Sequence, residues 1–168
     1  MNRLIAAALA LAAVPVLASD AFAQAVTKDQ LIGTWHLTAA TATDAVGVTL
    51  MSRHGQKPDG FMSISADNRA MVVLVNGATP KYGALTNDVA GNIFKSVSSW
   101  AARYEVDTAA TPDGNKITFR LDASIDPILT GTAQAYLAKM DGGNLILKSV
   151  VPAGSITGPV TFTFEKAK

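Results

Sequence analysis

The chain contains no cysteine and few charged residues, and both shortages narrow the classes of protein to which it can belong. Without cysteine there is no disulfide, so the fold must be held by its core alone. Charged residues make up 16% of the 168 positions, and the formal net charge is +1. Because no cluster of Lys and Arg occurs, we expect no nucleic-acid partner.

Histidine and the common catalytic motifs are also scarce. The two histidines, His36 and His54, form no His-x-His pair, and there is no cysteine to complete a zinc site. No Gly-x-Ser-x-Gly, His-Glu-x-x-His or P-loop pattern occurs. We therefore predict no catalytic residue, no metal and no cofactor, and we interpret both histidines as ordinary surface or rim residues.

Only one long apolar run is present, over residues 4–17, and it is rich in Ala, Leu and Val. Arg3 precedes the run, and Ala21-Phe22-Ala23 supplies the A-x-A pattern cleaved by signal peptidase. The alternative is a membrane anchor, but the run is too short to span a bilayer and contains Pro15.

These features predict a signal peptide over residues 1–23, cut after Ala23, followed by a single domain over residues 24–168. We expect no integral membrane segment after cleavage. An exported chain without disulfides fits a bacterial periplasm better than eukaryotic secretion, so the predicted location is periplasmic or secreted.

Alternating apolar and polar residues predict strands along most of the domain, clearest over residues 116–123. The expected strands lie at 34–40, 46–53, 61–66, 70–76, 103–107, 116–123, 132–140, around 145–147, and at 160–165. The continuously apolar residues 71–75 predict a strand covered on both faces. Small polar residues at 39–45 predict a bend, and Asp67-Asn68 a tight turn.

Two helical segments are expected among the strands. Thr27-Lys28-Asp29-Gln30 fits a capping box, which predicts one helical turn before Gly33. Apolar residues at helical spacing predict an inserted helix over residues 85–100, capped by Asn87 or Asp88. Short hairpin turns between strands favour a sandwich or an up-and-down barrel, and alternation alone does not separate these two.

Four segments, in order, resemble the bacterial lipocalin-like domain family. They are Leu31-Ile32-Gly33-Thr34-Trp35-His36-Leu37, the strand–turn–strand of residues 59–71, Trp100-Ala101-Ala102-Arg103-Tyr104-Glu105-Val106-Asp107, and Gly131-Thr132-Ala133-Gln134 with its following hairpin. The resemblance covers roughly residues 31–166. It implies an all-β, calycin-type antiparallel up-and-down β-barrel of about 8–9 strands, with a short N-terminal helical turn and one inserted helix.

The resemblance also implies how such a barrel is closed at one end. Gly33 and Trp35 would form the closure, with a cationic side chain over the indole. Lys166 is the candidate cation by position, and Arg103 is the alternative. Trp35 as a platform for ligand remains the other interpretation.

A barrel of eight strands has an interior just wide enough for one small ligand. The candidate pocket residues are the aromatic and long polar side chains Phe61, Tyr104, Phe119, Gln134, Tyr136 and Phe162. Gln134 and Tyr136 share one strand face, and inward placement would give the pocket a polar anchor. Arg103 and Glu105 share another face, which is either solvated or a buried pair.

The predicted function is binding of a small, mainly apolar molecule inside the barrel. One alternative is a barrel enzyme of isomerase or cyclase type. It would need a titratable group with a shifted pKa in the pocket, supplied by Tyr104, Tyr136, Glu105, His36 or Arg103. The other alternative is a non-catalytic scaffold with a filled core. Nothing in the sequence predicts the ligand's identity or an oligomeric state.

Overall fold

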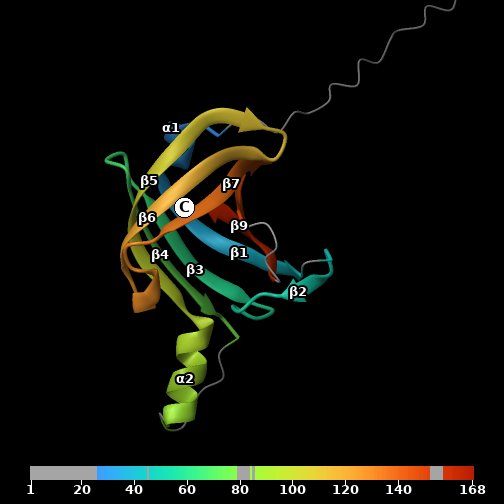
Figure 1. Cartoon of the computed structure of the whole chain (residues 1–168), viewed down its shortest axis with the longest axis vertical. Helices are drawn as coiled ribbons and strands as arrows, with labels where there is room; N and C mark the ends of the chain where they lie inside the picture. The colour runs from blue at the N-terminus through green and yellow to red at the C-terminus, as the bar shows by residue number, and fades with distance from the viewer. Residues whose placement is uncertain (1–25, 45, 79–83, 85, 152–156) are drawn as a thin grey trace, which may run out of the picture.

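Nine antiparallel strands form one continuous sheet in a computed structural model that describes residues 26–44, 46–78, 84, 86–151 and 157–168 (Figure 1). The strands are β1 (Gly33–Asp44), β2 (Thr49–Met51), β3 (Pro58–Ile64), β4 (Arg69–Asn76), β5 (Ser98–Thr111), β6 (Gly114–Ser124), β7 (Ala133–Asp141), β8 (Asn144–Ser149) and β9 (Thr157–Lys166). The helices are α1 (Lys28–Leu31), α2 (Asn87–Ser96) and the short 3₁₀ helix η1 (Pro127–Leu129). The predicted signal peptide lies outside the described residues.

The sheet closes on itself because the first long strand pairs with the last. The order is β2-β1-β3-β4-β5-β6-β7-β8-β9, and β1 also pairs with β9, from Trp35 opposite Lys166 to Asp44 opposite Thr157. Eight strands therefore form a barrel. The short strand β2 pairs with the later part of β1, along the same edge with which β3 pairs earlier in β1. The predicted all-β up-and-down barrel, with its helical turn and inserted helix, is confirmed.

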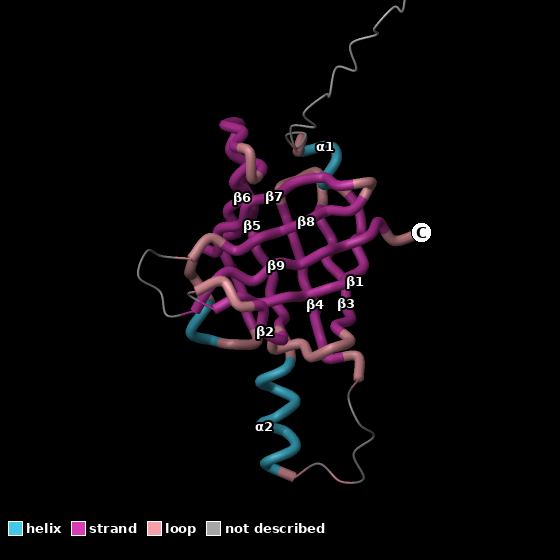
Figure 2. The backbone as a smooth tube through the Cα atoms, turned by 90° about the vertical axis from the view of Figure 1, so that its right-hand side faces the viewer, coloured by secondary structure: helices cyan, strands magenta, loops and turns pink. Residues whose placement is uncertain are grey.

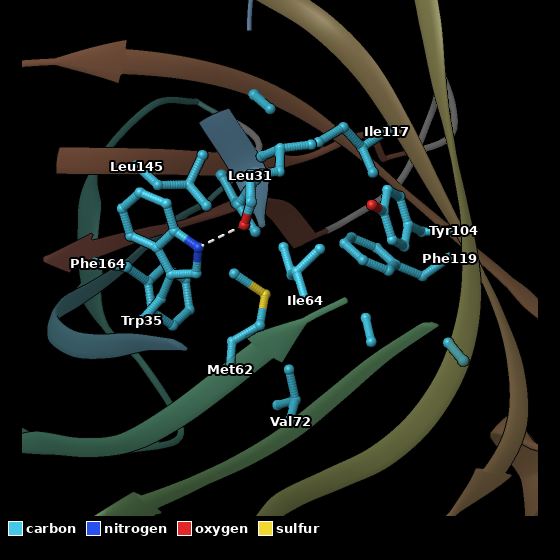
Figure 3. Packing of buried hydrophobic residues seen from close by; sticks show 14 of the residues in the cluster. Leu31, Trp35, Met62, Ile64, Val72, Tyr104, Ile117, Phe119, Leu145 and Phe164 are labelled. Atoms are coloured by element: carbon cyan, nitrogen blue, oxygen red, sulfur yellow. Dashed lines mark hydrogen bonds between the residues drawn. The ribbon is translucent and has the colours of Figure 1, made fainter. Parts of the chain in front are cut away.

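One end of the barrel is sealed by a packed core that also includes α1 (Figure 3). The Trp35 indole is 1% exposed, and its Nε1 donates to the Leu31 carbonyl over 2.8 Å. The cation over the ring is Lys166, whose Nζ lies 5.3 Å from the indole centroid. Gly33 has φ +137°, and a Cβ there would lie 2.9 Å from Lys166 Cε. Glycine at this position therefore leaves room for the lysine that covers Trp35.

The segment before β1 is fixed to this closed end by hydrogen bonds. Thr27 and Gln30 form the predicted capping box around α1. The Val26 amide donates to buried Asn115 Oδ1 over 2.8 Å, and Asn115 Nδ2 donates to the Asp107 carbonyl. These contacts tie the segment before α1 to β5 and β6, which lie across the barrel from β1.

The outer face of the barrel is open to solvent, which corrects one prediction. Strand β4 was expected to be covered on both faces, but Met71 and Val73 are 62% and 50% exposed. Their neighbours Ala70, Val72 and Leu74 are buried in the core. A barrel wall is a single layer, so a continuous apolar run still places alternate side chains in water.

Other predicted boundaries are also wrong. The strand expected over residues 46–53 is shorter, since β2 covers only Thr49–Met51. The expected bend at residues 39–45 is strand, because β1 continues to Asp44 through register shifts that accommodate its irregular pairing with β9. The expected helix over residues 85–100 begins after an N-cap at Thr86 and ends at Ser96, and Trp100 lies in β5.

Helix α2 projects from the end of the barrel opposite α1, as two views at right angles show (Figures 1 and 2). None of its residues is buried. No helix within the described ranges has the length and apolar character needed to cross a membrane.

Candidate functional site: a cleft at the mouth of the barrel

A cleft of about 170 Å³ opens at the end of the barrel opposite the Trp35 closure. It lies between α2, η1 and the mouth-facing ends of β5, β6 and β7. Its lining residues are Arg53, Phe94, Val97, Ser98, Ser99, Trp100, Leu121, Ser124, Ile125, Asp126, Leu129, Gln134 and Tyr136. The wall thus combines aromatic and aliphatic side chains with a small number of polar groups, as small-molecule sites usually do.

A second, smaller void of about 50 Å³ lies deeper in the barrel. It is lined by Phe119, Phe162 and other core side chains, and it shares Ser98, Trp100 and Tyr136 with the cleft. These three residues therefore stand between the mouth and the interior. Ligand sites for drug-sized molecules measure about 300–1,000 Å³. The available space fits a smaller molecule, seated at the mouth rather than in the filled lower half.

Aromatic rings form the floor of the cleft. The buried Phe119 ring lies 5.1 Å from Trp100 and 5.8 Å from Tyr136, centroid to centroid, the latter edge-on. Tyr136 in turn lies 6.3 Å from Phe162. Such contacts hold aromatic rings at fixed angles, so the polar ends of Trp100 and Tyr136 are presented from a rigid surface.

The Tyr136 hydroxyl is a polar group in an otherwise apolar part of the wall. Burial raises the pKa of Tyr136 to about 12, so the hydroxyl stays protonated at neutral pH. Within the described part of the chain it has no hydrogen-bond partner. No side-chain oxygen or nitrogen there is both sealed from solvent and unpartnered. The hydroxyl is therefore reachable from the cavity.

The same reasoning applies to Trp100 and Gln134. Neither the Trp100 Nε1 nor the Gln134 side-chain amide has a partner among described residues, and both residues are only partly buried. Both residues line the cleft.

The rim of the cleft is fastened by two residues of the loop between β2 and β3. Arg53 Nε donates to the Lys95 carbonyl over 2.9 Å, and Arg53 Nη2 donates to the Val97 carbonyl over 3.1 Å. His54 Nδ1 donates to the Ser96 carbonyl over 3.0 Å. These bonds occupy three consecutive carbonyls where α2 ends and β5 approaches, and we call this arrangement the rim clasp.

His54 lies at the rim, but it is buried there with 1% of its surface exposed, so it is not a surface histidine. The loop folds over the barrel end and packs the imidazole against Phe162, 6.1 Å away between centroids. Burial lowers the pKa of His54, although its bond to Ser96 acts in the opposite direction. The ring is therefore neutral at pH 7, with the proton on Nδ1.

Of the six predicted pocket residues, the structure brings four together. Gln134 and Tyr136 line the cleft, and Phe119, Tyr136 and Phe162 line the inner void. Phe61 does not belong to the interior, since it is 51% exposed on the outer wall. Strand alternation places Met62, not Phe61, inside. Tyr104 is buried in the closed half, where its hydroxyl donates to the Ser65 carbonyl over 3.1 Å.

The charged candidates lie on the outer wall. Arg103 and Glu105 are exposed, and Arg103 Nε lies 3.8 Å from Asp122 Oδ2. Arg103 is therefore not the cation over Trp35.

His36 is the other outer-wall candidate. Its Nε2 lies 2.9 Å from Asp59 Oδ1 and its Nδ1 lies 3.4 Å from Glu165 Oε1. The hydrogen bond with Asp59 is the main cause of a raised His36 pKa, with Glu165 adding to it.

Several cleft residues were not predicted from the sequence. Trp100 was assigned to the helix because it falls at helical spacing after Val97, although it lies in β5, which begins at Ser98. Leu121 follows Phe119 by two residues and lies on the same face of β6. The two-residue period of the strand could therefore have identified it. The contributions of Phe94 and Leu129 depend on how α2 and η1 sit over the mouth, for which the sequence carries no signal. Among the described residues, no three acidic or histidine side chains gather in a way that could hold a metal ion.

Comparison with known proteins adds little to this picture. No family model and no curated protein sequence matches the chain. The similar solved structures include the fluorescent protein UnaG, as wild type and as two single-residue variants. They share 13–14% sequence identity, cover 84% of this chain and 99–100% of their own, and superpose with TM-scores of 0.35–0.36. A likeness of this size carries no weight for function, which must be argued from the site.

Proposed function

We propose that this chain is an exported, lipocalin-like binding protein that holds a small, mainly apolar molecule at the mouth of its barrel. One observation carries the proposal. A barrel sealed at one end by Trp35 keeps an open, aromatic-floored cleft at the other, and the polar atoms of Trp100, Gln134 and Tyr136 in that cleft have no partner among the described residues. Unpartnered polar atoms on an apolar wall are what a bound ligand would satisfy.

The lining supports a largely apolar ligand of modest size. Apolar side chains come from α2, the start of β5, β6 and η1 and from the residues that link them, so an occupant would be enclosed on several sides. They are Phe94, Val97, Trp100, Leu121, Ile125 and Leu129. Each apolar Å² buried in such a site contributes about 25 cal/mol. The cleft volume of about 170 Å³ limits the ligand to something smaller than a typical drug.

Export and membership of the bacterial lipocalin-like family form part of the proposal. They are supported by the signal-peptide pattern of residues 1–23 and by the four motifs that begin with Gly33-Thr34-Trp35. Expression of the full chain in a Gram-negative host tests export. Intact mass measurement of the periplasmic fraction is expected to give a protein starting at Gln24. Uncleaved protein confined to the cytoplasm would contradict export without touching the binding proposal.

The binding function is favoured over an enzyme by the groups that face the cleft. Of the five titratable side chains available to a barrel enzyme, only Tyr136 lines the cleft, and its pKa of about 12 suits a permanent hydrogen-bond donor rather than a base. A scaffold with a filled core accounts for the lower half of the barrel. It leaves the open mouth, with its unpartnered polar atoms, without a role.

Native mass spectrometry of protein purified from its own host tests binding directly. We expect a mass increment from a co-purifying small molecule in the wild type. Gln134→Trp places an indole in the cleft without removing a hydrogen bond, and it should abolish the increment. Ala133→Trp is the matched control, because the neighbouring side chain is exposed on the outer wall. An increment that survives Gln134→Trp, or disappears equally in Ala133→Trp, would count against the cleft as the binding site.

A further inference from the structure

One unpartnered polar atom of the cleft can only donate a hydrogen bond, and this restriction carries information about the ligand. An indole nitrogen has one N–H and accepts nothing, so Trp100 Nε1 can be satisfied only by an acceptor. The Tyr136 hydroxyl keeps its proton because burial raises its pKa. Gln134 offers both a donor and an acceptor and fits either kind of partner. Trp100 and Tyr136, which carry two of these donors, stand at the boundary between the cleft and the inner void.

The charged side chains of the lining do not remove this restriction. Arg53 and Asp126 are the two charged residues that line the cleft in the described part of the chain. Asp126 Oδ1 accepts the Ile128 amide over 3.1 Å, which leaves Oδ2 as an acceptor at the rim. Arg53 uses Nε and Nη2 in the rim clasp, which leaves Nη1 at the edge of the cleft. A remaining guanidinium N–H adds a third donor at the rim.

We propose that the ligand carries a carbonyl or carboxylate oxygen on an apolar ring, and that the Trp100 indole N–H and the Tyr136 hydroxyl donate to this oxygen. The inference rests on the proposed binding function and specifies the chemistry of its ligand. The ring packs against Leu121 and the other aliphatic side chains of the cleft, and the oxygen points toward the inner void. A ligand whose polar group is only a donor, such as an amine, leaves the Trp100 N–H without a partner and so binds more weakly.

Three probes with the same ring and different polar groups test the inference. Cinnamate carries a carboxylate, methyl cinnamate carries a neutral ester carbonyl, and cinnamylamine carries a cationic donor. Each is titrated into ¹⁵N-labelled protein while the indole N–H signals are followed by NMR. Trp35 is the internal control, because its N–H already donates to Leu31 at the opposite end of the barrel. Trp100→Phe assigns the two signals.

Both acceptor probes should shift the Trp100 indole signal and leave that of Trp35 in place. Cinnamylamine should bind at least about fivefold more weakly, the effect of one unmatched hydrogen bond. Tyr136→Phe should weaken the two acceptor probes by a similar factor. This variant removes a hydroxyl with no intramolecular bond among the described residues, so its fold is expected to persist. Comparing the affinities of cinnamate and methyl cinnamate shows whether the negative charge strengthens binding beyond what the carbonyl oxygen shared by both probes provides.

The outcomes separate the inference from the function on which it rests. Equal or tighter binding of cinnamylamine, or acceptor binding that leaves the Trp100 signal unchanged, would overturn the donor assignment while the cleft remains a binding site. If none of the three probes shifts any backbone signal of β5, β6 or β7, the inference fails. The proposed function then fails as well if the native protein also carries no co-purifying molecule.

Discussion

Removing the Trp35 side chain is the most informative perturbation of the barrel's closed end. Trp35→Ala deletes a side chain that is 1% exposed, and it breaks the indole bond to Leu31 and the contact with Lys166. Replacing a buried Trp or Phe with Ala costs about 3–5 kcal/mol. Total stabilities of domains are about 5–15 kcal/mol, so this variant loses a large share of its free energy of unfolding.

The separate contributions can be resolved with smaller changes. Trp35→Phe keeps an aromatic ring but removes the indole N–H, whose bond is worth about 0.5–1.5 kcal/mol. Lys166→Met keeps the alkyl stem and removes the charge over the ring, with an expected loss of about 0.5–1 kcal/mol because the lysine is exposed. The expected order of destabilisation is therefore Trp35→Ala, then Trp35→Phe, then Lys166→Met.

Urea unfolding followed by far-ultraviolet circular dichroism gives the required free energies without depending on Trp fluorescence. Phe61→Ala is the control, since Phe61 is 51% exposed on the outer wall and should cost about 0.5 kcal/mol. The assignment of Trp35 as the closure would be refuted by a Phe61→Ala variant as destabilised as Trp35→Ala. It would also be refuted by a Trp35→Ala variant that keeps wild-type stability and loses only ligand binding.

Three further predictions concern other parts of the barrel. The pKa of His36 is raised above 6.5, so its ion pairs stabilise the fold at low pH and lose this effect as pH rises through the raised pKa. The stability gap between wild type and His36→Gln in thermal melts should thus be larger near about pH 5.5 than near about pH 8.5, and a gap that grows with pH would contradict this. Gly114→Ala places a Cβ 2.2 Å from the Ala138 carbonyl oxygen at φ +112° and should cost about 2 kcal/mol or more in urea unfolding. Gly142→Ala, which meets nothing within 4 Å, should cost about 1 kcal/mol, and equal losses would refute the steric argument. Asn115→Ala removes both bonds of a buried amide and should cost about 1–3 kcal/mol. It should also speed hydrogen exchange of the Val26 amide, and unchanged exchange would show that Val26 is held by other contacts.

The barrel was predictable because its signals are local and repeat along the chain. Alternation within residues 116–123 requires only that one face meets a core, and Phe119 and Leu121 do so. The Thr27 capping box and the Asp67-Asn68 turn depend on neighbouring residues alone, and Asn68 adopts the left-handed conformation at φ 64°. Closure of the sheet was available only through the resemblance, since the β1–β9 pairing leaves no mark in either strand.

The candidate site was less predictable because its residues are chosen by long-range geometry. Phe61 was placed inside on the strength of its aromatic ring, but the pairing of β3 with β1 turns Met62 inward. His54 lies in a loop with polar and glycine neighbours, which is the usual composition of an exposed segment. Its burial depends on the rim clasp with residues 95–97, more than forty positions away. Trp100 follows a helix without any breaker, so periodicity assigned it to the wrong element.

The pairing of β1 with β9 gives the barrel the connectivity of a ring. The Ala167 amide donates to the Thr34 carbonyl over 2.9 Å, so the end of the last strand lies beside the beginning of the first. The β7–β8 hairpin has its tip at Gly142 and Gly143. A Cβ added at either glycine would have no other atom within 4 Å. A circular permutant that joins residue 168 to the segment before α1, and opens the chain at this tip, keeps all eight strand pairings of the barrel. New ends at that hairpin would give tags or reporters an attachment point away from the mouth cleft and its rim clasp.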